Sequence, residues 1–125
     1  MQARQRAAIN RMKASPVNVL VIFYSCCGRT EKLALAAAVG AVQARANIRM
    51  RRLTDSGEEI PECQEALVRM RKEYVPPAPP DVVWADAVII GMNGKIAGVV
   101  EDAAQATAFG RRIAGETRAI KEGRQ

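Results

Sequence analysis

An uninterrupted apolar segment runs from Val17 to Tyr24 and stops at a short loop, SCCGRT, which leads directly into an alanine-rich helical pattern. The segment carries no charged residue and only one strongly polar residue, Asn18. A strand of this composition is typical of a parallel sheet that is covered on both faces, because both sets of side chains must then avoid water. The segment therefore predicts an α/β fold, and the helix after the loop is the first crossover.

The rest of the chain repeats this alternation of strands and helices. Ala46 to Leu53 alternates apolar with basic residues, as a half-exposed strand near a sheet edge does. Val88 to Gly91 is a short apolar strand closed by glycine. Helical patterns begin near Thr30, at Pro61 and at Glu101-Asp102. This order predicts a parallel sheet of three strands, with Lys95 to Val100 as the one candidate for a short fourth strand.

Three segments between these elements predict connections. Asp55-Ser56-Gly57 and Asn93-Gly94 are turn signals. The proline-rich segment Val75 to Pro80 is predicted to be an extended connector along the surface.

The SCCGRT loop has the residue types and the position of an anion-binding site. A helix N-terminus presents N–H groups without partners and a positive dipole end, and here a glycine, two hydroxyls and an arginine surround it. We therefore expect a bound phosphate group. The candidate binding residues are Ser25, Cys26, Cys27, Gly28, Arg29 and Thr30.

Composition excludes several other classes of protein. The 125 residues suffice for one domain, and the net charge of +6 is concentrated in residues 1–16, which hold no acidic residue. We expect residues 1–16 to be a flexible basic arm and residues 17–125 to be the folded domain. The few aromatic residues do not interleave with basic ones, so we expect no nucleic-acid partner. No apolar run has the length of a membrane span.

Cysteine and histidine usage narrows the chemistry further. Three cysteines, two of them adjacent, do not make a disulfide framework, and an adjacent pair bridges only with strain. We therefore expect a cytoplasmic protein in which Cys26 and Cys27 fill the loop. The absence of histidine removes Ser-His and Cys-His catalysis and histidine metal sites, and we expect no metal site.

Three stretches of the chain resemble flavodoxin-like FMN proteins, and among them the tryptophan-repressor-binding-protein-like NAD(P)H:quinone oxidoreductases. These are the first strand with the S-x-x-G-x-T loop and the helix start EKLA, the stretch Trp84 to Gly91, and the stretch Phe109 to Ala114. The resemblance implies a flavodoxin-like three-layer sandwich. It also implies FMN as cofactor, NAD(P)H as electron donor, a quinone as acceptor, and a phosphate site made by the SCCGRT loop.

The chain departs from this family after the third strand. In the family a Thr-Pro loop and two further strands flank the flavin ring, whereas here Gly91 is followed within a few residues by the last helix. The sheet is therefore predicted to be truncated, with three strands or four. We expect FMN-dependent quinone reduction to be weak or absent, and we expect a homo-oligomer because the missing strands leave apolar surface uncovered.

Two other classes of function remain open. One is a non-catalytic flavodoxin-like module that acts through oligomerisation. The other is a cysteine-dependent phosphoryl-transfer enzyme or a phosphotransferase-system IIB domain, which also places its cysteine after the first strand. Low-molecular-weight phosphatases need an arginine in the pattern Cys-x5-Arg, but Lys32 and Leu33 occupy the corresponding positions here.

Overall fold

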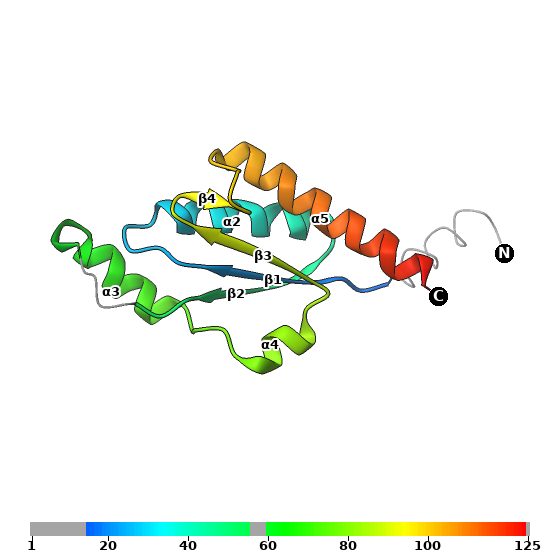
Figure 1. The fold of residues 1–125 in the computed structure, drawn as a ribbon, viewed down its shortest axis with the longest axis horizontal. Helices are drawn as coiled ribbons and strands as arrows, with labels where there is room; N and C mark the ends of the chain where they lie inside the picture. Colours follow the sequence, from blue (N-terminus) through cyan, green and yellow to red (C-terminus); the bar gives the residue numbers. More distant parts are fainter. Residues whose placement is uncertain (1–14, 56–59, 125) are drawn as a thin grey trace.

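The computed structural model describes residues 15–55 and 60–124 and has a four-stranded sheet at its centre (Figure 1). The strands are β1 (Asn18–Phe23), β2 (Asn47–Arg52), β3 (Ala87–Met92) and β4 (Lys95–Ile96), in the order β2-β1-β3-β4. β1 is parallel to both of its neighbours, as predicted. β4 pairs antiparallel with β3, so the sheet is mixed, and the expectation of a purely parallel sheet is wrong at this edge.

The antiparallel strand follows from the turn that precedes it. Asn93 and Gly94 both have positive φ, 54° and 72°, and form the two-residue connection between β3 and β4. Asn-Gly is the sequence that this kind of hairpin turn favours, because both of its residues must be left-handed. A two-residue turn can only reverse the chain, so the strand after it cannot be parallel.

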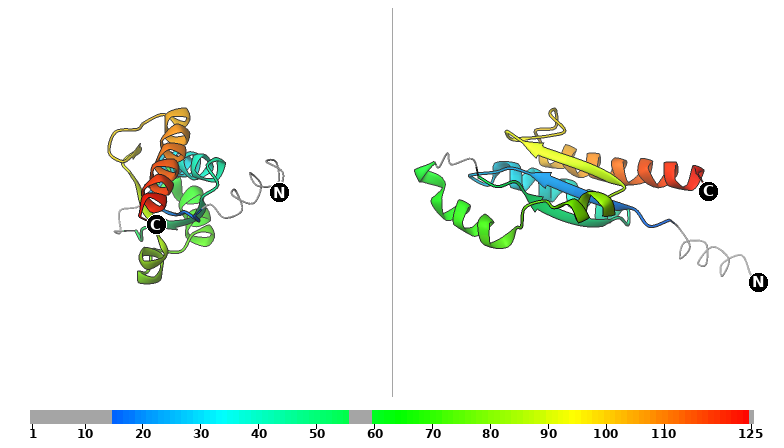
Figure 2. Two further views of the ribbon diagram at one scale, coloured as in Figure 1. Left: turned by 90° about the vertical axis from the view of Figure 1, so that its right-hand side faces the viewer. Right: turned by 60° about the horizontal axis from the view of Figure 1, so that its bottom comes forward.

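The helices lie on both faces of the sheet and beyond one end of it (Figures 1 and 2). They are α2 (Arg29–Gln43), the 3₁₀ helix η1 (Pro61–Cys63), α3 (Gln64–Glu73), α4 (Pro79–Trp84) and α5 (Ala103–Gly123). The helices predicted from Thr30, Pro61 and Glu101-Asp102 are therefore confirmed. α5 begins as predicted, because the Asp102 side chain accepts a hydrogen bond from the Gln105 N–H (3.0 Å).

One face of the sheet forms the core with α2. Val19, Val21 and Phe23 of β1 alternate toward this face, and Ile89 is opposite Val21 on β3. They pack against a face of α2 made of Leu33, Ala34, Ala37, Ala38 and Ala41. Because most of these helix residues are alanines, the helix axis can lie close to the strands.

α5 lies beside α2 and meets it through two glycines. A Cβ atom at Gly40 would collide with the carbonyl oxygen of Thr107, and one at Gly110 would collide with the carbonyl oxygen of Ala37. Ala106 and Ala114, one turn to each side of Gly110, are completely buried. The two helix backbones therefore approach one another at a distance that only glycine permits.

The opposite face of the sheet is covered only in part. α4 lies over β2, where Asp81 binds Arg49 and Arg51, and the Arg49 guanidinium stacks on Trp84. Beyond α4, the β3 side chains Val88, Ile90 and Met92 are 44–50% exposed. A strand side that carries only apolar residues is thus left open to solvent.

The proline-rich connector differs from its prediction at its end. Pro79 and Pro80 are the first residues of α4, so the extended segment ends at Ala78. Proline is accepted in the first turn of a helix, because its missing N–H would have no intrahelical partner there. Residues 1–14 of the predicted arm, and Ser56 and Gly57 of the predicted turn, lie outside the described residues.

The close crossing of α2 and α5 predicts a sharp difference between two glycines of the same helix. Gly110→Ala should lower the free energy of unfolding by about 3 kcal/mol, the upper end of the cost of overpacking, because backbone atoms cannot yield. Gly115→Ala meets nothing within 4 Å and should raise it by up to about 1 kcal/mol, the gain of alanine over glycine in a helix. Urea denaturation of both variants measures the difference. Equal stability of the two would contradict the crossing.

Candidate functional site

The SCCGRT loop lies at the carboxyl ends of the parallel strands, between β1 and α2. β2, the next strand in the chain, lies on one side of β1, and β3 lies on its other side. The direction in which strands are added to the sheet therefore reverses at β1. In open α/β sheets, ligands bind in the crevice outside such a reversal. The loop predicted from sequence is therefore at the position where this architecture favours a ligand.

The two hydroxyl side chains of the loop are buried and hold the backbone around them. Ser25 Oγ accepts a hydrogen bond from the Gly28 N–H (2.9 Å), and Thr30 Oγ1 accepts one from the Gly94 N–H (2.8 Å). Gly91 allows the second contact, since a Cβ there would lie 3.2 Å from the Thr30 methyl group. A hydroxyl that accepts in this way still has its own proton to donate.

Gly28 and Arg29 shape the mouth of the loop. Gly28 is the N-cap of α2 with a φ of 101°, a conformation that favours glycine. The N–H groups of Cys26, Arg29 and Thr30 have no acceptor among the described residues. The exposed Arg29 guanidinium lies beside the β3–β4 turn, where its Nε would be 3.2 Å from a Cβ on Gly94. In the described part of the chain Arg29 forms no ion pair.

Arg52, at the end of β2, holds the backbone of the loop at Ser25. It was not among the predicted site residues. Its Nε and Nη2 donate to the Ser25 carbonyl oxygen at 3.1 and 2.6 Å, and Nη2 also binds Asp55 at 2.8 Å. The hydrogen bond from Arg52 is the main reason why the pKa of Asp55 falls to about 2. Arg52 lies on the same strand face as the apolar residues Ile48 and Met50. A charged residue on the apolar face of β2 was the sequence signal that could have identified Arg52.

Glu31 places a negative charge next to the loop. Its buried carboxylate accepts both Nη groups of Arg69 (2.9 and 2.6 Å) and the Tyr74 hydroxyl (2.6 Å). The bonds from Arg69 lower the pKa of Glu31 against the effect of burial, so this group is ionised at neutral pH. Arg69 balances the Glu31 charge, whereas the exposed Arg29 has no ion-pair partner among the described residues.

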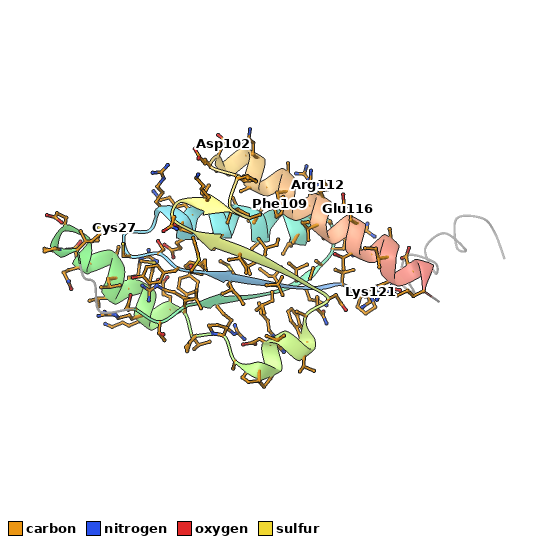
Figure 3. The ribbon with its side chains drawn as sticks, viewed as in Figure 1. Cys27, Asp102, Phe109, Arg112, Glu116 and Lys121 are labelled. Carbon is orange, nitrogen blue, oxygen red and sulfur yellow. A yellow bond between two sulfur atoms is a disulfide. The ribbon has the colours of Figure 1, made fainter. Side chains whose placement is uncertain are left out.

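The cysteines are arranged differently from the prediction. Cys27 forms a disulfide with Cys63, the N-cap of α3, across a Cα–Cα distance of 4.9 Å, and Cys26 is the free thiol. The expectation that Cys27 fills the loop as a thiol is therefore wrong, because the fold brings Cys63, 36 residues away in the sequence, next to the loop. The disulfide fastens the loop to α3 at the end of the molecule where Figure 3 labels Cys27.

A pocket of about 410 Å³ opens beside the β3–β4 hairpin. It is lined by Ile90, Met92, Asn93, Lys95, Ala97 and Gly98. A larger depression of about 520 Å³ lies along α3, and the described residues that line it all belong to that one helix. Only the first of the two adjoins the turn that Arg29 contacts.

The structure thus brings the six predicted site residues together at one edge of the sheet, with Arg52, Asp55 and Gly94 as additional supports. Residues of the described ranges 15–55 and 60–124 form no group of acidic and cysteine side chains that could hold a metal ion. No helix within those ranges is long and apolar enough to cross a membrane. The chain matches no protein-family model and no curated protein.

The Arg52–Asp55 pair predicts a pH-dependent loss of stability. Because the pKa of Asp55 is lower in the folded than in the unfolded chain, the pair stabilises the fold above about pH 4 and loses this effect as the pH falls toward 2. Asp55→Asn should lower the free energy of unfolding at pH 7 by about 2 kcal/mol and by little at pH 2. Urea titrations across this range measure it.

A matched acid-to-amide control is Glu116→Gln on α5. The Glu116 side chain is 64% exposed and pairs only at 3.8 Å with Arg112, so its loss should change stability little at any pH. Figure 3 shows both residues on α5, away from Cys27. If Asp55→Asn behaves like this control, the pair does not support the loop as described.

Proposed function

We propose that this protein binds FMN through its phosphate group at the SCCGRT loop. The observation that carries the proposal is that the loop lies at the reversal of strand order, where the N–H groups of Arg29 and Thr30 have no acceptor among the described residues and the Arg29 side chain is exposed. The resemblance to flavodoxin-like FMN proteins supplies the identity of the ligand. The geometry of the loop supports binding of the phosphate group of that ligand.

The residues present fit a phosphate group in three respects. The N–H groups of Arg29 and Thr30 are available, and the helix dipole favours an anion in front of them. The Ser25 and Thr30 hydroxyls accept backbone N–H groups and so keep a proton to donate to a phosphate oxygen. Arg29 would add a charge-assisted hydrogen bond of about 1.5–3 kcal/mol.

The residues present offer less to the flavin ring. The place of the family's first ring-contacting loop is taken by the two-residue turn Asn93-Gly94. The pocket beside this turn presents Ile90 and Met92 on one strand and Lys95 on the next. In this proposal the ring lies over that pocket with part of its surface in water.

Bound FMN would supply two-electron chemistry, with NAD(P)H as donor and a quinone as acceptor, as in the oxidoreductases that the chain resembles. The chain's own part is to anchor the phosphate and orient the ring. Because an open ring site does not exclude water, we expect NAD(P)H:quinone oxidoreductase turnover to be weak or absent. The cytoplasm, which the cysteine count predicts, stays a proposal, and the Cys27–Cys63 disulfide weighs against it because disulfides are rare in a reducing compartment.

Flavin binding tests the phosphate site directly. Titration of the protein with FMN and with riboflavin, followed by flavin fluorescence, should show tighter binding of FMN. Arg29→Ala should raise the Kd for FMN about 10-fold or more and leave that for riboflavin unchanged, since only FMN carries the phosphate. Ser25→Ala should also weaken FMN binding, because Gly28 loses its hydrogen bond acceptor.

The control for this titration is Arg112→Ala, which removes an exposed arginine from α5 and keeps the net charge equal to that of Arg29→Ala. It should bind FMN like the wild type. Equal affinity of all these proteins for FMN, or no binding at millimolar FMN, would rule out the phosphate site.

A second candidate function is that of a non-catalytic module that assembles with copies of itself. Two apolar surfaces favour it: Val88, Ile90 and Met92 on β3, and Leu35, Val39 and Val42 along the outer side of α2. Each residue of both sets is between 42% and 51% exposed. Contiguous apolar surface of this kind is a mark of association. Cysteine-dependent phosphoryl transfer has less support, because Cys27 is bonded to Cys63.

Light scattering tests the assembly. The wild type should have a mass that is a multiple of the 13.6 kDa chain. Ile90→Lys and Val39→Lys place a charge on one surface each, and the variant that reduces the mass to that of one chain identifies the interface. A monomeric wild type at high protein concentration would exclude this function.

A further inference from the structure

The three cysteines of the chain form one cluster that the proposed FMN site does not use. The Cys27–Cys63 disulfide joins the SCCGRT loop to the start of α3, and the Cys26 Sγ lies 3.7 Å from the Cys27 Sγ. Cys27 is exposed to solvent, and Cys26 and Cys63 are partly exposed. None of the three cysteine residues is buried, so the cluster lies at the surface of the molecule.

Both sulfur atoms of the disulfide lie at the beginning of a helix. Cys27 directly precedes Gly28, the N-cap of the 15-residue α2, and Cys63 is itself the N-cap of the 10-residue α3. A helix N-terminus stabilises a thiolate, since the dipole places positive charge there. A Cys27 thiolate at the start of α2 is stabilised in this way, which favours Cys27 as the leaving group when the disulfide is opened.

Opening the disulfide does not require α3 to leave the domain. Arg69 and Tyr74 remain bound to Glu31 of α2, and Tyr74 packs edge-on against Phe23 with ring centroids 4.9 Å apart. Leu67 and Met70 of α3 are buried. The cost of opening is therefore confined to the loop and the first turn of α3.

We propose that the Cys27–Cys63 disulfide is a thiol–disulfide exchange site whose substrates are low-molecular-weight thiols such as glutathione. The thiolate of one substrate molecule attacks Cys63 Sγ, a sulfur–sulfur bond forms between them, and Cys27 leaves as a thiolate with the electron pair of the broken bond. A second thiolate attacks the substrate sulfur of the mixed disulfide. It releases Cys63 as a thiolate, so two thiols are oxidised to one disulfide and the protein gains two thiols.

Cys26 is a positioning residue in this exchange. Its thiol is in contact with Cys27 Sγ and can donate a weak S–H hydrogen bond to the leaving thiolate. It is not the partner that closes a second disulfide, because adjacent Cα atoms are only about 3.8 Å apart, below the usual span of a disulfide.

Counting thiols in the native protein tests the exchange. After equilibration with oxidised glutathione, alkylation and intact mass should show an intact Cys27–Cys63 bridge, with Cys26 outside it as a free thiol or as a mixed disulfide with one glutathione. Millimolar reduced glutathione should give three free thiols without loss of the circular dichroism of the fold. Cys26→Ala should go from none to two, but more slowly than the wild type gains its two thiols, because the leaving thiolate loses the S–H donor. In Cys27→Ser, Cys63 should take up one glutathione from oxidised glutathione.

Three outcomes would overturn the proposal. The first is a disulfide that resists millimolar glutathione until guanidinium unfolds the protein, which would make it a structural staple. The second is a count of three free thiols under oxidised glutathione, which would mean that the bridge does not form. The third is a Cys27→Ser protein whose Cys63 forms no mixed disulfide. None of these readouts depends on FMN, so they are independent of the proposed function.

Discussion

The close crossing of α2 and α5 is the contact on which the rest of this small domain depends. The sheet has only three strands of useful length, and one of its faces is covered mainly by α2. α5 completes that layer because Gly40 and Gly110 let the two backbones meet. With α5 in place, Ala106 and Ala114 are buried and the C-terminal turn returns to the start of β1, where Lys121 binds Pro16 and Asp86. The core of the described residues is thereby covered although their sheet has no strand beyond β4.

Local signals in the sequence were sufficient to predict most elements of the fold. The run from Val17 to Tyr24 predicted β1, the alternation near Ile48 predicted an edge strand, and Asp102 marked the start of α5. Each of these depends on neighbours within a few residues. The Cys27–Cys63 pair joins residues 36 apart, and the Asn93-Gly94 turn was recognised without the antiparallel strand that it imposes. The disulfide and the antiparallel pairing depend on which distant segments meet in the fold. The residue pattern of one segment therefore could not predict them.

In the candidate site, too, the residues of the loop could be predicted from the sequence, but the residues that support the loop from other elements could not all be predicted. The six loop residues were predicted from their order between a strand and a helix, and they do lie together. Their supports come from elsewhere: Arg52 from the end of β2, Gly94 from the hairpin, and Arg69 from α3. Arg52 could have been noticed, because a charged residue on the apolar side of a strand requires a buried partner. Gly94 could not, because nothing near it in the sequence indicates contact with Thr30.

The open surface of β3 and the pocket beside the β3–β4 hairpin have one physical origin. In a longer parallel sheet, a loop and a crossover helix would follow β3, and they would cover Ile90 and Met92 and also wall a ligand. Here a two-residue turn replaces them, so the same side chains line the 410 Å³ pocket and remain half exposed. A ligand ring and a second copy of the chain would therefore compete for Ile90 and Met92. Occupation of that surface by both is possible only if the ligand is buried between copies, which would exclude water from it more fully than a single chain does.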